Sequence, residues 1–489
     1  MPGRRQLCTA LLLVSAVATA AGGDRHDDFA HLVEINEASL VMLAEQSLLP
    51  EGLAVRIADG IRAIDAEQVA PGSRRSSNYL VFEARLLELA GSEASRLHIG
   101  RSRQDIGSTL RRMALREALL DVFEALLEAR AALLELAAEH VDTVIPAYTH
   151  GVQAQPTTLA HYLLAFAGAF ERDSQRYREV YGRLNRSPLG AAALGTSGFP
   201  IERGRLAELL GFDAAVENSY DANLVASVDS KIEFANAMAV SAVPVGQLMQ
   251  NLHTQYHSAN AWILLDEEDT DVSSIMPQKR NPRPLDRVRT LATGVIGNAH
   301  LVTLNAHNTM SGMNDYRPAD QALETAGDAI DMYDTYRGVL DSLVVSPDRA
   351  LAEINAEYST MTEVADTLLR HADVPFRVAH HYASELTDYG RSSGKRPVDI
   401  SDAELAQVYR DAVGEPLPVD VELVRNAMDP QAMVRSRRGL GGPQPAEVRR
   451  MLDAGAAALA ADRSWLGGAR ERLANAAAGR SRALAALQP

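Results

Sequence analysis

STLRRMALREALLDVFEALLEARAALLELAAEHVDTVI, residues 108–145, contains neither glycine nor proline. Leucine, alanine, arginine and glutamate dominate it, and these residues have high intrinsic helix propensity. At 1.5 Å per residue, a helix of this length spans about 55 Å. The stretch therefore predicts one long α-helix around which the rest of the chain must pack.

Other long stretches with few or no helix breakers follow along the chain, at 157–181, 213–243, 247–265 and 285–310. No segment alternates apolar and polar residues for long enough to predict a substantial sheet. The sequence has no βαβ pattern, no GxxxxGK[ST] and no GxGxxG. Helices this long cannot all bury their apolar faces within one compact chain, so we expect an all-α fold whose bundle is shared between subunits.

The composition is that of a globular protein, with 46% hydrophobic and 23% charged residues in a chain of 489. Acidic residues outnumber basic ones, 64 to 48, which gives a formal net charge of −16. Nucleic acids and anionic membranes are bound through a basic surface, so neither is expected as the main partner. A locally positive pocket for a small anionic substrate remains compatible with this balance.

The length predicts roughly three domains. Glycine and proline gather at 375–400 and 439–445, which indicates a smaller helical domain at the C-terminal end. The predicted division is a leader at 1–21, an N-terminal helical domain at 22–107, a central long-helix bundle at 108–358 and a C-terminal helical domain at 359–489.

The chain opens with MPGRRQLCTALLLVSAVATAAGG, which has the pattern of a secretory signal peptide. An arginine pair precedes an apolar run at 7–18 that is too short to span a bilayer, and small residues predict cleavage near Ala20–Ala21. We expect export to the periplasm, by the general or the twin-arginine route; a wrongly assigned start codon would leave the protein cytoplasmic. The only cysteine, Cys8, lies in this leader, so the mature chain has no disulfide and no cysteine-bound metal.

Three polar segments interrupt the helices: HIGRSRQD at 98–105, IPAYTHGVQAQP at 145–156 and SSIMPQKRNP at 273–282. The arginines and the hydroxyl of the first could bind a carboxylate at a helix N-terminus, or could form a solvated first turn. The second places a histidine between two helices, where a structural role is more common than a catalytic one. In the third, a lysine near two serines could lower a hydroxyl pKa; otherwise the segment is a plain loop.

SSIMPQKRNP resembles the signature of the fumarase/aspartase superfamily, and its Met-Pro-Gln-Lys form points to the argininosuccinate lyase branch. HIGRSRQD and YTH…AQP resemble the first and second signature regions of that branch. Similar matches are SPLGAAALGTSGFPIER at 187–203, PFRVAHH at 375–381 and DPQAMVRSRRGLGGPQPAEV at 429–448. The resemblance covers about residues 30–455, almost the whole mature chain.

The resemblance implies an all-α, three-domain fold whose long central helices join four subunits in a tetrameric helical core. Each active site would take segments from three subunits. The implied reaction is an anti β-elimination that releases fumarate from an N-substituted aspartate, with argininosuccinate, which gives arginine and fumarate, as the best single substrate. The implied partners are a small succinyl-amine substrate and the chain itself as a homotetramer. No cofactor and no metal are implied, and the thirteen histidines include no HExxH motif.

The resemblance also implies residue roles. Ser273 matches the catalytic base, and Lys279 matches a residue that binds a succinyl carboxylate and could stabilise the serine alkoxide. His150 matches the histidine that assists the acid side, and Asp286 stands where the family has a glutamate that pairs with it. The implied substrate-binding residues are Ser102, Arg103, Gln104, Thr149, Gln155 and Asn281. The segment at 273–282 would be a lid that closes over the substrate.

Several positions depart from the family pattern. Val272 stands where glycine is usual, Gln104 replaces an asparagine, and Gly151-Val152 replaces a Leu-Gln pair. NAHNTMSGMNDYRPADQALE, at 305–324, lacks the segment that binds the guanidino-amino-acid half of argininosuccinate. Gln278 disfavours adenylosuccinate, whose lyases usually have histidine there.

The half of the site that forms fumarate is therefore predicted to be intact, and the half that binds the amine to be altered. Two alternatives stay open on this ground. One is a lyase for another aminodicarboxylic acid, similar to the ethylenediamine-disuccinate lyases. The other is a tetramer that binds a ligand or serves as a scaffold without catalysis, like the lens crystallins of this family.

Overall fold

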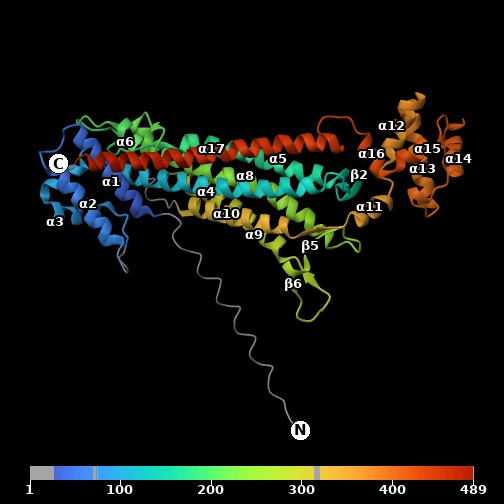
Figure 1. The fold of residues 1–489 in the computed structure, drawn as a ribbon, viewed down its shortest axis with the longest axis horizontal. Coiled ribbons are helices and arrows are strands. Elements are labelled where there is room, and N and C mark those ends of the chain that lie inside the picture. Colours follow the sequence, from blue (N-terminus) through green and yellow to red (C-terminus); the bar gives the residue numbers. More distant parts are fainter. Residues whose placement is uncertain (1–26, 70–72, 74, 313–319, 488–489) are drawn as a thin grey trace, which may run out of the picture.

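The computed structural model describes residues 27–69, 73, 75–312 and 320–487. The molecule is elongated, with a bundle of long helices in the middle and a smaller helical region at each end (Figure 1). The predicted all-α class is confirmed, since every strand is short and pairs with only one other. The predicted leader lies outside the described residues, as do residues 313–319 of the altered segment 305–324.

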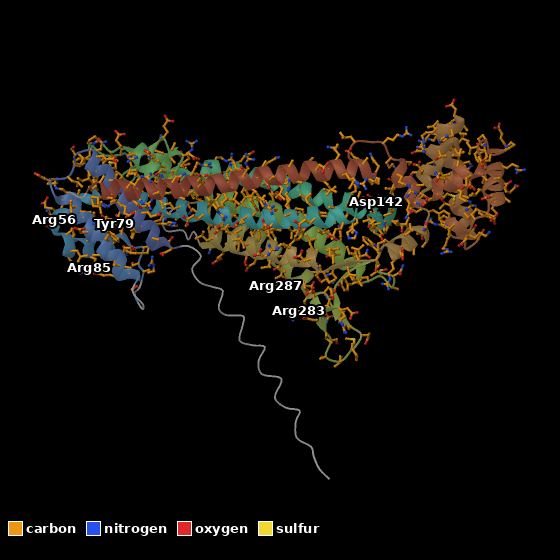
Figure 2. The ribbon with its side chains drawn as sticks, viewed as in Figure 1. Arg56, Tyr79, Arg85, Asp142, Arg283 and Arg287 are labelled. Atoms are coloured by element: carbon orange, nitrogen blue, oxygen red, sulfur yellow. The ribbon has the colours of Figure 1, made fainter. Side chains whose placement is uncertain are left out.

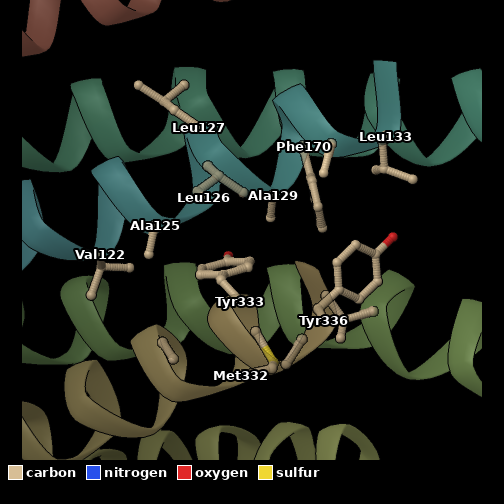
Figure 3. Close-up of a cluster of buried hydrophobic side chains, with 14 of the residues drawn as sticks. Val122, Ala125, Leu126, Leu127, Ala129, Leu133, Phe170, Met332, Tyr333 and Tyr336 are labelled. Carbon is tan, nitrogen blue, oxygen red and sulfur yellow. The ribbon is translucent and has the colours of Figure 1, made fainter. Parts of the chain in front are cut away.

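Six helices form the bundle: α4 (Arg103–Glu139), α5 (Leu159–Leu184), α8 (Ala226–Gln255), α9 (Arg283–Ala306), α10 (Asp320–Asp341) and α17 (Pro445–Ala485). The predicted long helix is α4, and it contacts α5, α10 and α17. Because neighbours cover several of its sides, α4 buries residues all round rather than along one stripe. Near its middle, Phe170 of α5 packs edge-on against Tyr333 of α10, with ring centroids 5.7 Å apart (Figure 3).

Helix α8 differs from the prediction. The sequence indicated two helical stretches separated at Pro244 and Gly246, whereas the structure has one continuous helix with Pro244 inside it. A proline in a helix interior removes one backbone hydrogen bond and usually bends or breaks the helix. Here Val245, Leu248 and Met249 are fully buried in the bundle core, and their burial keeps the helix together across the proline.

The long helix predicted at 213–243 begins later in the structure, at Ala226. Its first residues form the short strand β4 (Ala214–Ala215) and the short helix α7 (Ser219–Leu224). The side chain of Asn218 accepts hydrogen bonds from two backbone N–H groups and caps α7. Capping by asparagine therefore starts a separate short helix before α8.

One end region packs α1 (Asp28–Glu45), α2 (Leu53–Val69), α3 (Tyr79–Ala90), the 3-10 turn η1 (Ser92–His98) and α6 (Arg203–Leu209) around a second core. The other end region contains α11 (Pro347–Asn355), α12 (Met361–Ala372), α13 (Phe376–Ser392), α14 (Asp402–Val413), α15 (Val421–Met428) and α16 (Pro430–Ser436). Short 3-10 turns are η2 (Glu267–Asp269) and η4 (Pro397–Asp399).

The strands of the described residues form four two-stranded pairs. Antiparallel pairs are β1 (Val144–Thr149) with β2 (Val152–Thr158), β5 (Ile263–Leu265) with β8 (Leu343–Val345), and β6 (Asp271–Val272) with β7 (Arg280–Asn281). The strand β3 (Arg186–Ser187) pairs in parallel with β4. Two of these pairs carry the segments singled out in the sequence.

Helix α17 packs differently from the predicted division, which assigned it to a C-terminal domain at 359–489. It returns along the whole bundle to the N-terminal end region (Figure 1). Leu459, Leu466 and Ala469 are buried in the bundle core, and Trp465 packs against Phe123 of α4. Apolar side chains on α17 thus stabilise its place beside α4 and α5 rather than among α11–α16. Among the described residues, no helix is both long and apolar enough to cross a membrane.

Candidate functional site

The segment at 273–279 forms the turn of the β6–β7 hairpin, which projects sideways from the bundle (Figure 1). Arg283 and Arg287 lie at the start of α9, where the hairpin joins the bundle (Figure 2). Residues 274–279 are exposed, and the side chain of Ile275 is 83% exposed. Val272 and Met276 of the same hairpin are exposed as well, at 66% and 38%, so the hairpin presents a group of apolar side chains that another molecule can cover.

Ser273 starts this turn and is half-buried. Its Oγ accepts a hydrogen bond from the backbone N–H of Met276, at 3.2 Å, and its own N–H donates to the carbonyl of Lys279, at 3.3 Å. A donated N–H stabilises negative charge on a serine oxygen. Within the described residues the ammonium of Lys279 makes no hydrogen bond and no salt bridge, so it is available to an anion.

Asn281 and Asp286 follow the turn. The Asn281 side-chain amide donates to the carbonyl of Asp271, at 3.2 Å, which places it on the hairpin beside Ser273. Asp286 lies in the first turn of α9, with its Oδ1 3.5 Å from the Nδ1 of His253 and 3.5 Å from Arg289. Within one chain Asp286 therefore faces His253 and not His150.

His150 lies at the tip of the β1–β2 hairpin. The sequence predicted a loop between two helices here, and the structure has two short strands joined by His150 and Gly151. Both residues have positive φ, +54° and +77°, as a two-residue type I′ turn requires. The His-Gly pair was the signal for this turn; prolines in both strands concealed it, because proline is rare in strands.

The side chains of this hairpin fall into two groups. Thr149 and His150 are exposed at the tip. Gln155 donates to Thr362 Oγ1 of α12, at 3.0 Å, and Tyr148 donates to Glu353 of α11. The hairpin is thus attached to the end region that carries α11–α16, and its tip is open to solvent.

The segment at 98–105 starts α4. Ser102 is the N-cap: its Oγ accepts from the N–H of Gln104, at 3.2 Å, and its own N–H donates to Asp105 Oδ1, at 2.6 Å. Asp105 Oδ2 accepts from the N–H of Gly190, and burial raises the pKa of this carboxyl. Arg103 is exposed. Ser102, Arg103 and Gln104 hence form an exposed or half-buried helix N-terminus, which is suited to an anion.

Arg101, the first arginine of this segment, has a different environment. It is buried and donates to Asn36 and Ser39 of α1, with its guanidinium over the ring of Tyr79. Of the two arginines that could bind a carboxylate, the structure therefore leaves Arg103 accessible.

The three segments do not meet within one chain. Ser102 lies at the start of α4, whereas the β1–β2 hairpin follows its end, so a helix of 37 residues, about 55 Å long, separates them. The β6–β7 hairpin leaves the bundle at a third place (Figure 1). A site that uses all three segments must combine more than one chain.

In the described part of the chain, no group of three or more histidine, cysteine, aspartate or glutamate side chains could hold a metal ion. The sequence did not single out His253 of α8, whose Nδ1 lies 3.5 Å from Asp286 Oδ1, because no local pattern links positions 253 and 286.

Comparisons with known proteins show which family the chain resembles. A family model described as "Lyase" matches residues 56–297, and one described as "Argininosuccinate lyase C-terminal" matches 358–435. An argininosuccinate lyase of Methanothermobacter thermautotrophicus is 32% identical over 431 residues, which cover 87% of this chain and 91% of that protein. Argininosuccinate lyase 2 of Agrobacterium fabrum is 33% identical over 424 residues, 85% of this chain and 84% of its own.

Among solved structures, EDDS lyase in complex with formate superposes with a TM-score of 0.86 at 32% identity, over 94% of this chain and 92% of that one. A class II fumarase of Schistosoma mansoni superposes with a TM-score of 0.65 at 15% identity, over 83% of this chain and 90% of its own, and shares the fold.

Proposed function

The chain belongs to the argininosuccinate lyase branch of the fumarase/aspartase superfamily and is a carbon–nitrogen lyase, and on this premise we propose that it cleaves argininosuccinate to arginine and fumarate. The observation that carries the proposal is the β6–β7 turn, where the Ser273 oxygen accepts a backbone N–H and the ammonium of Lys279 makes no hydrogen bond or salt bridge with the described residues of its own subunit.

In this proposal Ser273 is the base. Its alkoxide takes a proton from the carbon next to one succinyl carboxylate, and the electron pair of that C–H bond forms the new double bond as the C–N bond breaks. The Met276 N–H and the positive charge of Lys279 stabilise the alkoxide before the reaction. The departing nitrogen receives a proton from the acid side, where His150 acts.

The carboxylates of the succinyl half need donors that strengthen their contacts as negative charge develops. We assign this role to Lys279 and Asn281 on one hairpin, to Thr149 on the other, and to Ser102, Arg103 and Gln104 at the start of α4. The exposure of Lys279, Arg103 and Thr149 supports the assignment, because each can reach a ligand without breaking a contact inside its own subunit. Gln155 is assigned a supporting contact through its attachment to α12.

We further propose that the active unit is a homotetramer. The separation of the three segments by the length of α4 supports this, since one chain cannot bring Ser273, His150 and Ser102 together. Exposed apolar side chains on the bundle support it as well: Val240 and Val243 on α8 are 47% and 50% exposed, and Ile296 and Leu304 on α9 are 42% and 54% exposed. In the tetramer His150 of one subunit would reach Asp286 of another.

A second candidate substrate is ethylenediamine-disuccinate or a similar aminodicarboxylic acid. The superposition with EDDS lyase at 32% identity favours it, and so does the loss of the amine-binding pattern at 305–324. Ultraviolet detection of fumarate, with each compound supplied in turn to the mature protein, separates the two. Faster turnover of argininosuccinate supports the main proposal, and faster turnover of the disuccinate replaces it.

For location we propose the periplasm, because the leader has the pattern of a signal peptide. Expression of the full chain, followed by fractionation and mass determination of the N-terminus, tests this. A mature protein that starts near residue 21 in the periplasmic fraction is the expected result. A full-length protein in the cytoplasm would contradict it.

A further inference from the structure

A histidine, an arginine and an aspartate meet at the base of the β6–β7 hairpin. His253 lies in the last turn of α8, and Asp286 lies in the first turn of α9, with Arg289 three residues further on. The chain between these two helix ends includes the hairpin that carries Ser273. The contact between α8 and α9 therefore closes the base of the segment on which the proposed catalytic base lies.

One nitrogen of the Arg289 guanidinium faces both of the other groups. Its Nη1 lies 3.2 Å from His253 Nδ1 and 3.5 Å from Asp286 Oδ1. A guanidinium only donates hydrogen bonds, so His253 Nδ1 accepts, and the imidazole is neutral with its proton on Nε2. The two hydrogens of this one nitrogen thus serve the imidazole and the carboxylate together.

The imidazole of His253 is held by ring contacts. Tyr256 packs edge-on against it, with ring centroids 6.2 Å apart, and His257 stacks on it at 6.4 Å. The Tyr256 hydroxyl accepts from a backbone N–H of β5, at 3.0 Å, which attaches this end of α8 to the strand. The side chain of His253 is 26% exposed, compared with 58% for Asp286. The more buried histidine therefore orients Arg289, and Arg289 in turn orients the more exposed carboxylate.

Asp286 needs such support because it is shorter than the glutamate that the family has at this position. Aspartate lacks one methylene group, so its carboxylate extends less far from α9. Among the described residues Oδ2 accepts no hydrogen bond, whereas Oδ1 faces Arg289. A carboxylate that is held by one oxygen presents the other in a defined direction, which determines how it can meet an imidazole from another subunit.

We propose that His253 and Arg289 are positioning residues for Asp286. His253 orients the guanidinium, and the guanidinium holds Oδ1, so that Oδ2 is presented to His150 of another subunit. This inference rests on the proposed function, in which Asp286 and His150 pair across the tetramer. Neither positioning residue touches the substrate, so both act on kcat through Asp286 and leave unchanged the carboxylate contacts that set KM.

The first test is a double-mutant cycle on the mature enzyme, measured as fumarate release from whichever candidate substrate turns over faster. We expect His253→Leu and Arg289→Met each to lower kcat by about tenfold, with KM within about twofold of wild type. His253→Asn places an amide oxygen near the position of Nδ1 and should restore most of the loss. In an Asp286→Ala background His253→Leu should cause no further loss, because the residue through which it acts is gone. Should His253→Leu fail to fold, Arg289→Met, on the more exposed side chain, completes the cycle.

The pH dependence of kcat is a readout that packing alone would not move. A nearby carboxylate makes an imidazolium keep its proton to higher pH. Once Asp286 loses its orientation, the alkaline limb of the kcat profile should move to lower pH, by about half a pH unit, in both His253→Leu and Arg289→Met. Loss of the Arg289 charge alone, with Asp286 still in place, would move this limb to higher pH. The sign of the shift therefore separates positioning from a simple effect of charge.

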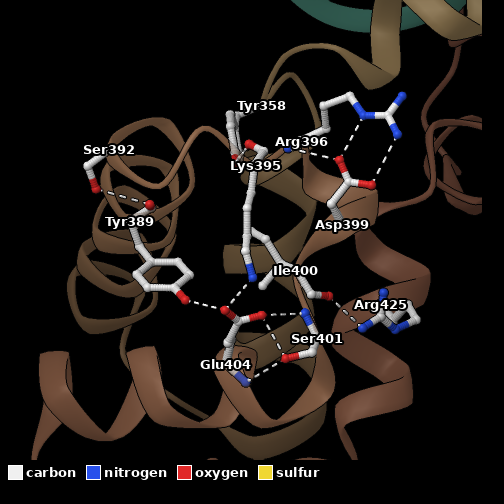
Figure 4. A network of polar contacts seen from close by, with 10 residues as sticks. All are labelled: Tyr358, Tyr389, Ser392, Lys395, Arg396, Asp399, Ile400, Ser401, Glu404 and Arg425. Atoms are coloured by element: carbon white, nitrogen blue, oxygen red, sulfur yellow. Dashed lines mark hydrogen bonds and ion pairs between the residues drawn. The ribbon is translucent and has the colours of Figure 1, made fainter.

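The matched control is Arg396→Met, which removes an arginine three residues from its aspartate partner, Asp399, in the C-terminal end region (Figure 4). Its kcat, KM and pH profile should equal those of wild type. A kcat within twofold of wild type in both His253→Leu and Arg289→Met overturns the inference. An equal further loss in the Asp286→Ala background, or an alkaline limb that moves to higher pH, also overturns it. A wild type that releases fumarate from neither argininosuccinate nor the disuccinate overturns the proposed function itself, so the two failures are distinct.

Discussion

In the middle of the bundle, Arg130 of α4 is fully buried between Asp462 of α17, at 3.0 Å, and Glu171 of α5, at 2.6 Å. In the β6–β7 hairpin, Lys279 extends from an exposed turn and makes no salt bridge among the described residues. The first cation has two partners in its own subunit and joins three helices. Lys279 has no such partner among the described residues of its own subunit, so its charge is available to a ligand. Substitutions in the two regions should thus separate folding from chemistry.

The largest expected effect is on turnover. Ser273→Ala removes the proposed base, and fumarate release should fall by about 10³-fold. The melting temperature should stay at its wild-type value, since the side chain makes contacts only within an exposed turn. Ser274→Ala, on the next and exposed residue, is the control and should retain activity. Equal losses in the two variants would contradict the assignment of Ser273 as the base.

Arg130→Met should act on stability instead. It leaves Asp462 buried beside a single remaining cation, Arg178, at 3.2 Å, and should lower the free energy of unfolding by about 3–5 kcal/mol. Arg463→Met, on the same helix, removes an exposed pair with Glu128 and should cost less than about 1 kcal/mol. Chemical denaturation measures both. Similar denaturation midpoints for the two variants would show that the buried ion pair contributes no more to stability than the exposed one.

His150→Asn tests whether a residue of the other exposed hairpin, β1–β2, also acts on turnover and not on stability. Asparagine tolerates the left-handed backbone that His150 adopts, so the β1–β2 turn should be retained. Loss of the acid-side group should lower kcat by about 10²-fold with an unchanged melting temperature. The control His161→Asn changes a histidine that contacts Gly441 and Thr157 and should affect stability rather than kcat. A kcat within twofold of wild type in His150→Asn would reject the proposed role.

The smallest effect concerns pH. Asp173 of α5 is buried, and burial raises the pKa of this carboxyl in the folded state. The native protein thus binds the proton more tightly than the unfolded chain, and wild type loses stability as pH rises through the native pKa. Asp173→Asn stays neutral, so its stability relative to wild type should increase from pH 4 to pH 8. Denaturation midpoints at several pH values measure this, and a difference that decreases with pH would refute it.

The sequence was informative where local preference and tertiary packing agree. The absence of breakers predicted α4, and the polar segments at 98–105, 145–156 and 273–282 predicted the candidate site. It was less informative where packing overrides preference, as at Pro244, where buried neighbours keep α8 continuous. The His150–Gly151 hairpin was missed because proline obscured two short strands.

Long-range placement was the hardest to predict. No local pattern shows that α17 packs along α4, since this depends on which apolar faces remain uncovered after the other helices pack. Local sequence patterns also could not predict which histidine contacts Asp286. Within one chain it faces His253, and a pairing with His150 would depend on how subunits assemble.

The position of α17 also affects how the protein is made. The ribosome synthesises this helix after every other described element, yet Arg480 near its end forms salt bridges with Glu34 and Glu37 of α1, one of the first segments to emerge. Leu484 and Leu487 pack against the same N-terminal core. Helix α1 therefore reaches its final packing only after α17 has been synthesised.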